Sequence, residues 1–414
     1  MSGKIAIIGA GIVGVCCAVE LIERGFDVTL IDKNDPGKET SYGNAGVIAR
    51  SSLVPLNHPG IWKSLPKLLR NKATSFRYNP YFLAANTNWT AKFLKHANDK
   101  DFLYTATALD NLIKLSTDKH EQSASKLDLA EKFNKKGWFY LYRTDDAFRR
   151  AKNLHNSYQQ YNIKTEIMDQ DRIFELEPSL TTIFNKGLWI QDTYSYSDPG
   201  ALVSAYADYF KSLGGTIIKS FAQGLEKVDQ GYHLILNQQR LKVDQVVVAL
   251  GPWAKDFLRN FGYQVPLAFE RGYHLNYTTS SNHQLTRPVY DVEGGYVLAP
   301  MKGGVRLTTG VELTSHDAPP NYKQIKAAEI SAREAFPLKK PLEEKPWLGS
   351  RPTLPDCRPI IGSAPRHNDL WLAIGHQHIG FSTGPGTASI LGALISGENP
   401  PIDAKPFRAE RFIS

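Results

Sequence analysis

KIAIIGAGIVG, residues 4–14, is an apolar, β-branched run that passes directly into the pattern G-x-G-x-x-G. A helix-like segment over residues 15–24 follows, Gly25 ends it, and a second β-branched run over residues 27–31 ends in Asp32. Strand, glycine pattern, helix, strand and acid in this order form one βαβ unit, which is the arrangement that binds dinucleotides. The sequence therefore predicts a Rossmann-like α/β fold around these residues.

Each position of this unit has a physical task. Gly9 allows the tight turn out of the strand, and Gly11 leaves room for a pyrophosphate to approach the backbone. Gly14 lets the helix pack closely on the strand, and the helix N-terminus offers free N–H groups and a partial positive charge to phosphates. Asp32 can accept hydrogen bonds from both ribose hydroxyls of an adenosine, and it would repel the 2′-phosphate of NADP. The unit thus indicates FAD or NAD.

Length and composition are those of an ordinary globular protein. The chain has 414 residues, of which 42% are apolar and 22% are charged, and a chain of this length usually forms two domains. It has no apolar run near the ~18 residues of a membrane span, and its first apolar residues belong to a strand instead of a secretory signal. Cys16, Cys17 and Cys357 suit a reducing compartment and lack metal-ligand spacing. We expect a cytoplasmic protein without a metal site.

The net charge of +8 is compatible with an anionic partner. No nucleic-acid-binding motif accompanies the charge, so nucleic acid is not expected as a partner. Between residues 62 and 95, basic side chains are interleaved with aromatic ones. This pattern fits an amphipathic helical lid with a solvated face, or a surface that rests on anionic lipid. The basic residues are Lys63, Lys67, Arg70, Lys72, Arg77, Lys92 and Lys95.

The rest of the chain alternates between strand and helix patterns. An apolar run over residues 243–251 predicts a buried parallel strand, and alternating runs between residues 263 and 313 predict an antiparallel sheet. Another apolar strand is expected over residues 371–375, and a final helix over residues 387–395 follows the Gly-Pro-Gly at 384–386. Because cofactor-type elements occur at both ends, we expect two interleaved domains. The expected bounds are 1–80, 145–260 and 340–414 for the cofactor domain, and 81–144 and 261–339 for the substrate domain.

Three further blocks join the βαβ unit in a recognisable order. They are TSYGNAG at residues 40–46, VVVALGPW at 246–253, and the C-terminal pair GSRPTLPD at 349–356 and GHQHIGFSTG at 375–384. With these blocks, the chain resembles the D-amino-acid oxidase superfamily of flavoproteins over essentially its whole length, and within it the bacterial D-amino-acid dehydrogenase group. The resemblance implies FAD as the cofactor and a Rossmann-like FAD-binding domain interleaved with a substrate domain built on an antiparallel β-sheet.

The resemblance also implies where FAD is held. The adenosine end lies on the βαβ unit, and the isoalloxazine ring lies beside residues 41–47. Residues 375–383 bring N–H groups near the N1–C2=O edge of the flavin, where reduction places negative charge. The cofactor-binding residues expected on this basis are Gly9, Gly11, Ile12, Val13, Gly14, Asp32, Lys33, Thr40, Ser41, Asn44, Ala45, Gly46, Val47, Ala222, Ala249, Leu250, Gly251, Trp253, Gly349, Arg351, Gly375, His376, Ile379, Gly380, Phe381, Ser382 and Thr383.

Arg351 is the residue expected to bind the substrate carboxylate. In similar enzymes the arginine of this Arg-Pro block grips the α-carboxylate in a bidentate pair, for which guanidinium geometry is suited. Tyr273 and His274 lie on a strand where such enzymes line the pocket, and His376 and His378 flank the flavin; each also fits a plain structural role. With the carboxylate held and the amine neutral, the Cα–H bond can break by hydride transfer to flavin N5 without a strong general base.

The chain departs from its relatives at two places. Some members attach FAD through a cysteine in the block before Pro-Asp, where this chain has Gly349-Ser350-Arg351. Cys357 lies outside that position, so we expect noncovalent FAD. Residues 377–381, QHIGF, differ from the better-known D-amino-acid dehydrogenases, which indicates a remodelled pocket.

The expected function is oxidative deamination of a small amino acid, with a D-amino acid favoured, giving an imine and then a 2-oxo acid. The resemblance implies that electrons pass to a quinone or another carrier, which suits a peripheral contact with the inner face of the cytoplasmic membrane. The alternatives are an oxidase of glycine, sarcosine or cyclic secondary amines of the proline or hydroxyproline type, a non-catalytic flavin-binding protein, and an NAD-dependent dehydrogenase. The sequence predicts neither the handedness of the substrate directly nor the oligomeric state.

Overall fold

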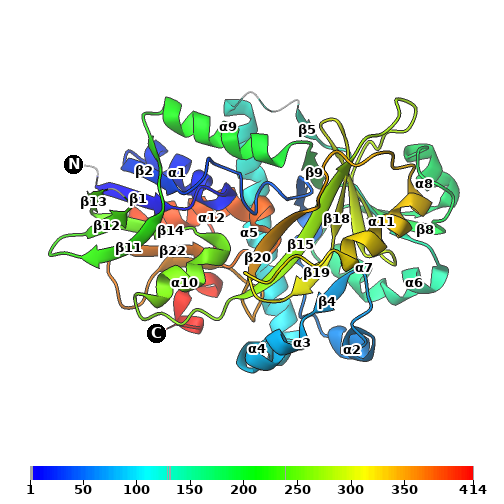
Figure 1. The fold of residues 1–414 in the computed structure, drawn as a ribbon, viewed down its shortest axis with the longest axis horizontal. Helices are drawn as coiled ribbons and strands as arrows, with labels where there is room; N and C mark the ends of the chain where they lie inside the picture. The colour runs from blue at the N-terminus through cyan, green and yellow to red at the C-terminus, as the bar shows by residue number, and fades with distance from the viewer. Residues whose placement is uncertain (1–2, 128, 130–131, 238, 414) are drawn as a thin grey trace.

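The computed structural model describes residues 3–127, 129, 132–237 and 239–413. Within this part of the chain, six strands form the Rossmann-like sheet on the left of Figure 1, with β1 near its centre. Strand β1 pairs in parallel with β2 and β14, and β21 is an antiparallel edge strand. The predicted α/β fold is thus confirmed. In spatial order the strands are β10 (Thr216–Lys219), β2 (Asp27–Asp32), β1 (Lys4–Ile8), β14 (Gln245–Val248), β22 (Leu370–Ile374) and β21 (Ile360–Ser363).

The alternation of side chains along β1 explains how both faces of this sheet are covered. Ile5 and Ile7 point into an apolar cluster with helices, and Ala6 and Ile8 point into a second cluster on the other face, since successive strand residues face opposite sides. All four side chains are at most 1% exposed. The first face is covered by α1 (Ile12–Glu23), α5 (Asp99–Lys126), α9 (Pro199–Ser212) and α12 (Gly380–Ile395), and the second by β11 (Ala222–Lys227), β12 (Tyr232–Leu236), β13 (Arg240–Val243) and α10 (Ala254–Arg259).

Helix α12 begins at Gly380, earlier than the expected start at Thr387. Its glycines allow close packing on two neighbouring helices. A Cβ on Gly384 would lie 3.2 Å from Ile12 of α1, and one on Gly386 would lie 2.8 Å from a backbone oxygen of α5. Tertiary packing therefore makes this Gly-Pro-Gly segment helical, although its local propensity is low.

A buried histidine compensates for the proline inside α12. Pro385 has no N–H to donate to the carbonyl of Phe381 one turn earlier. The Nε2 atom of His120 in α5 donates to that oxygen instead, at 2.9 Å, and the Nδ1 atom lies 3.1 Å from the hydroxyl of Tyr206. His120 is 0% exposed. The helix thus continues through Pro385 without an unsatisfied buried carbonyl.

The second unit is a large sheet, mostly antiparallel, on the right of Figure 1. Two of its pairings, β6 with β16 and β4 with β19, are parallel. Helices α8 (Gln170–Leu176) and α11 (Lys323–Ala335) pack against it over an apolar cluster. Its strands are β4 (Phe76–Tyr78), β19 (Val311–Leu313), β15 (Ala268–Tyr277), β18 (Gly304–Thr309), β17 (Tyr296–Met301), β16 (Val289–Asp291), β6 (Trp138–Tyr142), β8 (Lys186–Ile190) and β7 (Thr165–Asp169), with β20 (Trp347–Thr353) paired to β15.

The division into a cofactor domain and a substrate domain remains a prediction, and the pairing of the strands offers a guide to its bounds. Strands β7 and β8 fall within the segment 145–260 assigned to the cofactor domain, yet they pair with each other and β8 pairs with β6. Strand β20 falls within 340–414 and pairs with β15 along its whole length. We propose that all three strands belong with the substrate domain.

Helices α2 (Ile61–Leu69), α3 (Pro80–Ala85) and α4 (Thr87–Lys95) project at the lower edge of the molecule in Figure 1. No residue of α2 is buried. In the described part of the chain, no helix is both long and apolar enough to cross a membrane. The remaining elements are β3 (Val47–Ala49), β9 (Thr193–Tyr196) and β5 (Phe133–Asn134) in a small sheet, α6 (Asp145–Arg150), α7 (Lys152–Gln160), and short 3₁₀ helices at Arg50–Leu53, Gly251–Trp253, Lys405–Phe407 and Ala409–Arg411.

Candidate active site

A cavity of about 1670 Å³ is lined by both units of the molecule. Its wall begins at the ends of β1 and β2, passes the N-terminus of α1, and reaches β15 and β20 of the large sheet. Sites for small molecules usually measure roughly 300–1,000 Å³. The cavity therefore has room for a long cofactor together with a second small molecule.

The glycine pattern gives the first part of this wall its shape. Gly9 has a φ of +110°, and a Cβ there would lie 2.4 Å from the carbonyl oxygen of Ala249 in the neighbouring loop. A Cβ on Gly14 would lie 1.8 Å from the carbonyl oxygen of Gly9. Gly11 instead lines the cavity, and the nearest atom to its Cβ position is the hydroxyl of Ser41 at 3.3 Å. Two glycines thus bring backbone segments together, and the third opens the backbone to a ligand.

Asp32 at the end of β2 faces the same cavity. Its Oδ2 accepts the N–H of Ala10 at 2.7 Å, and its Oδ1 accepts the N–H of Asn34 at 2.9 Å. Burial raises the pKa of this carboxyl, and the two hydrogen bonds oppose that shift. Next to it, the Nζ of Lys33 lies 4.2 Å above the ring of Trp253. The carboxylate orientation is therefore fixed before any ligand binds.

The loop between β2 and β3 is held from both sides of the cavity. The hydroxyl of Ser41 accepts the N–H of Ile12 at 3.0 Å, at the start of α1. Arg306 on β18 donates to the backbone carbonyls of Tyr42 and Asn44, at 2.9 and 2.6 Å. Both bonds come from Nη1, while Nε donates to the Oδ1 of Asn276 on β15 at 3.0 Å. The loop is thereby fixed between the Rossmann-like unit and the large sheet.

Arg351 enters the cavity from β20. In the pairing of β15 with β20, Gly272 lies opposite Gly349, and a Cβ on Gly272 would lie 2.3 Å from the Nη2 of Arg351. Gly272 therefore leaves the space that the guanidinium occupies. Arg351 donates from its Nη1 to the carbonyl oxygen of Gly310 at 3.3 Å, which is its one hydrogen bond to the described residues. Burial lowers the pKa of Arg351, and the charge of Glu270 opposes this shift.

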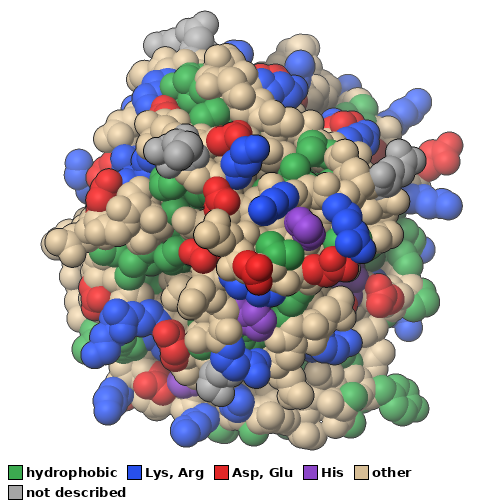
Figure 2. Space-filling view, turned by 90° about the vertical axis from the view of Figure 1, so that its left-hand side faces the viewer, with side chains coloured by type: hydrophobic (Ala, Val, Ile, Leu, Met, Phe, Trp, Pro, Cys, Tyr) green, Lys and Arg blue, Asp and Glu red, His purple; other side chains and the backbone are tan. Residues whose placement is uncertain are grey.

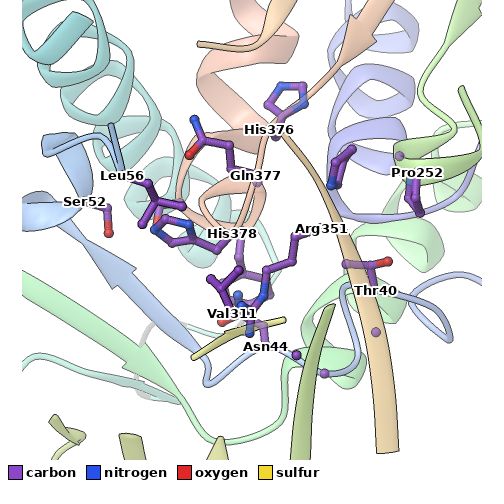
Figure 3. Close-up of a pocket in the computed structure, with 18 of the residues that line it drawn as sticks. Thr40, Asn44, Ser52, Leu56, Pro252, Val311, Arg351, His376, Gln377 and His378 are labelled. Carbon is purple, nitrogen blue, oxygen red and sulfur yellow. The ribbon is translucent and has the colours of Figure 1, made fainter. Parts of the chain in front are cut away.

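The segment between β22 and α12 carries two predicted histidines with different surroundings. The Nε2 of His376 lies 3.0 Å from the hydroxyl of Thr387, and burial lowers the pKa of His376 to about 3. His378 has a side chain that is 37% exposed and lines the cavity. In Figure 3 the ring of His376 points away from the group formed by Arg351, Val311 and His378. Of the two, His378 is placed to meet a ligand beside Arg351.

Tyr273 and His274 point to opposite sides of β15. The hydroxyl of Tyr273 donates to the carboxylate of Glu312 at 2.7 Å and accepts from Arg271 at 2.9 Å, so it is directed into a buried ionic network. The ring of His274 is 2% exposed and stacks on Trp347, with a centroid distance of 4.8 Å. Burial, followed by the charge of Arg306, lowers the pKa of His274 to about 3. Trp347, and not His274, lines the cavity here.

The structure places most predicted site residues on this one cavity. Of the predicted catalytic residues, Arg351, Tyr273, His376 and His378 line it, and His274 does not. The predicted cofactor residues that lie behind its wall are Gly14, Gly46, Gly375, Ile379 and Thr383. Those that line it are Gly9, Gly11, Ile12, Val13, Asp32, Lys33, Thr40, Ser41, Asn44, Ala45, Val47, Ala222, Ala249, Leu250, Gly251, Trp253, Gly349, Arg351, His376, Gly380, Phe381 and Ser382.

Comparison with protein families identifies this architecture. The DAO family, described as FAD dependent oxidoreductase, matches residues 4–394. The chain belongs to this family. It is therefore an FAD-dependent oxidoreductase, and the expectation of FAD is confirmed. The family also excludes the alternative of an NAD-dependent dehydrogenase, which rested on the βαβ unit alone.

Curated relatives align over nearly the whole chain. A D-amino-acid oxidase of Bradyrhizobium diazoefficiens is 29% identical over 426 residues, which cover 99% of each chain. A D-amino acid dehydrogenase of Rhizobium johnstonii is 26% identical and covers 99% of this chain and 100% of the relative. Both relatives are thus similar to this protein at full length.

Solved structures share the fold. The L-proline dehydrogenase from P. horikoshii superposes with a TM-score of 0.75 at 18% identity, covering 99% of this chain and 97% of that chain. Glycine oxidase from Bacillus cereus superposes with a TM-score of 0.72 at 18% identity, covering 96% of each. At this identity the likeness shows the fold alone.

The residues of the cavity fit FAD. Gly11 leaves the backbone open where a pyrophosphate would pass, and as the N-cap residue it has no side chain to cap α1. Ser41 accepts the N–H of Ile12, and the partial positive charge at this end of the helix suits phosphate. Asp32 lies at the strand end where a ribose binds. Cys357 is buried and does not line the cavity, and burial raises the pKa of its thiol far above the ordinary value. This thiol is not placed to attach a flavin.

Sequence reasoning missed several residues of the wall and its support. Trp138, Tyr140, Tyr158 and Tyr290 form an aromatic side of the cavity, in which the rings of Tyr140 and Tyr290 meet edge to face at 5.1 Å. Glu270 lies directly behind Arg351 and His378. These residues come from distant strands and helices, and no local pattern marks them. The aromatic run WFYLY at 138–142 can be read in the sequence, but which of its side chains face the cavity cannot.

Proposed function

We propose that this protein oxidises a small amino acid, of the D configuration, to an imine that hydrolyses to a 2-oxo acid. The observation that carries the proposal is Arg351, a guanidinium on the cavity wall with one hydrogen bond to the described residues. A half-buried arginine on a cavity wall is suited to a carboxylate, which it can bind through two parallel hydrogen bonds.

The chain's own residues would position the substrate and keep water out. Arg351 holds the α-carboxylate, which fixes the orientation of Cα, and the aromatic side formed by Trp138, Tyr140, Tyr158 and Tyr290 encloses the side chain. Such positioning can supply about 7–11 kcal/mol of the activation barrier in favourable cases. When bound, FAD supplies the hydride acceptor. We further propose that FAD is held without a covalent bond.

The names of the curated relatives support a D-amino acid, because D-amino-acid oxidase and D-amino acid dehydrogenase both align at full length. Glycine, sarcosine and cyclic secondary amines are the next candidates. They differ from the first proposal only in what occupies the space around Cα and the nitrogen. Membership of a family of FAD-dependent oxidoreductases argues against the alternative of a non-catalytic flavoprotein.

Anaerobic mixing with a panel of D- and L-amino acids, prolines and glycine should bleach the visible absorption band of the bound flavin. We expect bleaching by D-amino acids and not by their L-enantiomers, since the curated relatives that align at full length are named for D-amino acids. Stopped-flow absorbance under nitrogen measures the rate for each compound. Bleaching by glycine alone would assign a glycine-type substrate, bleaching by prolines alone would assign a cyclic secondary amine, and a flavin that no compound bleaches would place the substrate outside the amino acids of this panel.

We propose a membrane quinone as the electron acceptor, reached through the surface formed by α2, α3 and α4. Residues 40–98 contain eight Lys and Arg and no Asp or Glu, whereas Lys and Arg are interspersed with Asp and Glu on the face shown in Figure 2. Trp62, Leu69 and Tyr81 on this surface are 49%, 62% and 86% exposed. Basic and apolar side chains together suit an anionic lipid surface. Lys63 and Ser64 of α2 also line the cavity, so this surface adjoins the cofactor site.

The double variant Lys67→Glu/Arg70→Glu should lose binding to anionic lipid. Each basic residue near such a surface contributes about 1 kcal/mol, so reversing two charges should weaken binding by at least about 30-fold. Co-sedimentation with phosphatidylglycerol vesicles measures this binding, and high salt should release the wild type. Arg240→Glu/Lys242→Glu on β13 makes the same charge change elsewhere and should bind normally.

The acceptor is tested in the same vesicles. Enzyme reduced by its substrate should be reoxidised faster by quinone in anionic vesicles than by dissolved oxygen, and the α2 variant should lose this advantage. Rapid hydrogen peroxide production in air, with no benefit from vesicles, would assign an oxidase instead.

A further inference from the structure

A buried carboxyl lies behind the proposed substrate site. Glu270 on β15 is 1% exposed and lies opposite Arg351 in the register of β15 and β20. The hydroxyl of Thr353 donates to its Oε1. Its Oε2 has no hydrogen-bond partner among the described residues and lies 3.9 Å from the Nδ1 of His378. A buried carboxyl oxygen without a hydrogen-bond partner lowers the stability of the fold, which points to a functional role for this oxygen.

We propose that His378 and Glu270 form a dyad that accepts the proton of the substrate's ammonium group. This inference rests on the proposed function. His378 touches the cavity and Glu270 does not, so His378 is the catalytic residue and Glu270 is the positioning residue behind it. In an α-amino acid the carboxyl carbon and the nitrogen are attached to the same Cα, so a carboxylate held by Arg351 places the ammonium near the cavity wall that His378 shares with it. The dyad would thereby supply the neutral amine that hydride transfer requires.

The proton step balances within the site. An N–H bond of the ammonium breaks and leaves its electron pair on nitrogen, while the Nε2 of His378 gains the proton. The positive charge on the imidazole is then offset by the carboxylate of Glu270, to which Nδ1–H can donate. The lone pair left on nitrogen forms the C=N bond when the hydride leaves Cα. Distances between such catalytic partners are often long before substrate binds, which is consistent with 3.9 Å.

The charges that face the dyad support this order of events. Burial raises the pKa of Glu270 to about 7, while Thr353 and Arg351 lower it. Enclosure in the site and the charge of Arg351 lower the pKa of His378. Cys357 also faces Glu270, and its thiol stays protonated because burial raises its pKa. A substrate carboxylate on Arg351 offsets the charge that suppresses protonation of His378, so the imidazole becomes a better base when the ammonium arrives.

The variant Glu270→Gln keeps the size of the side chain and removes its charge. In wild type, anaerobic flavin reduction should become faster as pH rises through about 7, where the dyad loses its proton. In the variant this rise of the rate with pH should disappear, and flavin reduction at pH 7.5 should be about 100-fold slower than in wild type. Near pH 10, where the substrate amine is already neutral, the two rates should converge. His378→Gln should also lose this rise of the rate with pH, and Glu270→Asp should retain part of it.

Two comparisons separate this role from a structural one. Glu177→Gln removes another buried carboxylate, which pairs with Arg287 at 2.9 Å outside the cavity, and should change stability without moving the pH profile. Pyruvate carries a carboxylate and no ammonium. Its binding should make the wild-type protein take up protons, and its binding to Glu270→Gln should not. Titration calorimetry in buffers of different ionisation enthalpy measures this uptake.

The outcomes distinguish the dyad from the proposed function. If no amino acid reduces the flavin but pyruvate binding still takes up protons in a Glu270-dependent way, the function fails and the dyad stands. If Glu270→Gln and His378→Gln both keep the wild-type pH profile and proton uptake, the dyad is wrong while amino-acid oxidation stands.

Discussion

Arg351→Ala should raise KM for the amino-acid substrate by about 100-fold or more while FAD stays bound. Removing one partner of a desolvated, hydrogen-bonded charge pair costs about 2–5 kcal/mol, and each 1.4 kcal/mol corresponds to a factor of ten. Arg351 has the position for such a pair, since its guanidinium lines the cavity. Steady-state kinetics with the best substrate of the panel measures KM, and the flavin spectrum after gel filtration measures retained cofactor.

Two further variants separate charge from geometry at this site. Arg351→Lys keeps the charge but loses the planar fork, so its KM should lie between those of wild type and Arg351→Ala. Gly272→Ala keeps the arginine but places a Cβ 2.3 Å from its Nη2. Because the guanidinium ends a flexible side chain, we expect it to move and KM to rise. Arg333→Ala, on α11 outside the cavity, is the control. An unchanged KM in all three site variants would place the carboxylate elsewhere.

The βαβ unit and its cofactor could be predicted because their signals are local. The residues Gly9, Gly11, Gly14 and Asp32 lie within one short stretch, and each has a physical task that depends mainly on its neighbours in sequence. The structure bears this out, since a Cβ on Gly9 or Gly14 would collide with backbone. The start of α12 was not predictable in the same way. Its helical form depends on α1 and α5, and on His120, which lies far away in sequence.

The substrate end was only partly predictable because strand register is not visible in a single sequence. Alternate residues of a strand face opposite sides, so Tyr273 and His274 could not both line one cavity with their side chains. The pairing of β15 with β20 decides which residues of β15 face Arg351, and these are Glu270 and Gly272. Glu270 lies in a strand that also carries Arg271 and His274, so nothing in the sequence marks it, and its role depends on a partner strand roughly eighty residues away.

Acid should destabilise this protein steeply between pH 6.5 and pH 5. Burial lowers the pKa of His120 to about 4 and those of His274 and His376 to about 3. The unfolded chain therefore binds protons at about pH 6.5, while the folded protein does not. The stability is full above pH 6.5 and is lost as pH falls toward 4. Each histidine should lower the free energy of unfolding by about 2 kcal/mol at pH 5. The three together approach the ~5–15 kcal/mol by which folded proteins are usually stable.

Glu270 and His378 should add little to this slope, because their shifts oppose each other. The pKa of the carboxyl is raised and that of the imidazole is lowered, so the folded pair holds its proton on Glu270 over the range where the unfolded chain holds it on His378. The number of bound protons is then nearly the same in both states, and stability does not change with pH. The three deeply buried histidines carry the effect.

His120→Gln should test about one third of this slope. Urea unfolding at pH 7.5, 6 and 5, with the same excess of FAD throughout, measures stability in each protein. The variant should be less stable than wild type at pH 7.5, since the imidazole no longer donates to the carbonyl of Phe381, but it should lose about 2 kcal/mol less between pH 6.5 and pH 5. Tyr206→Phe removes the hydroxyl that lies 3.1 Å from His120 and keeps the buried imidazole. It should be destabilised and retain the full slope. Parallel pH dependence in wild type and His120→Gln would show that the folded protein binds protons at His120 as readily as the unfolded chain does, and would assign the acid sensitivity to other groups.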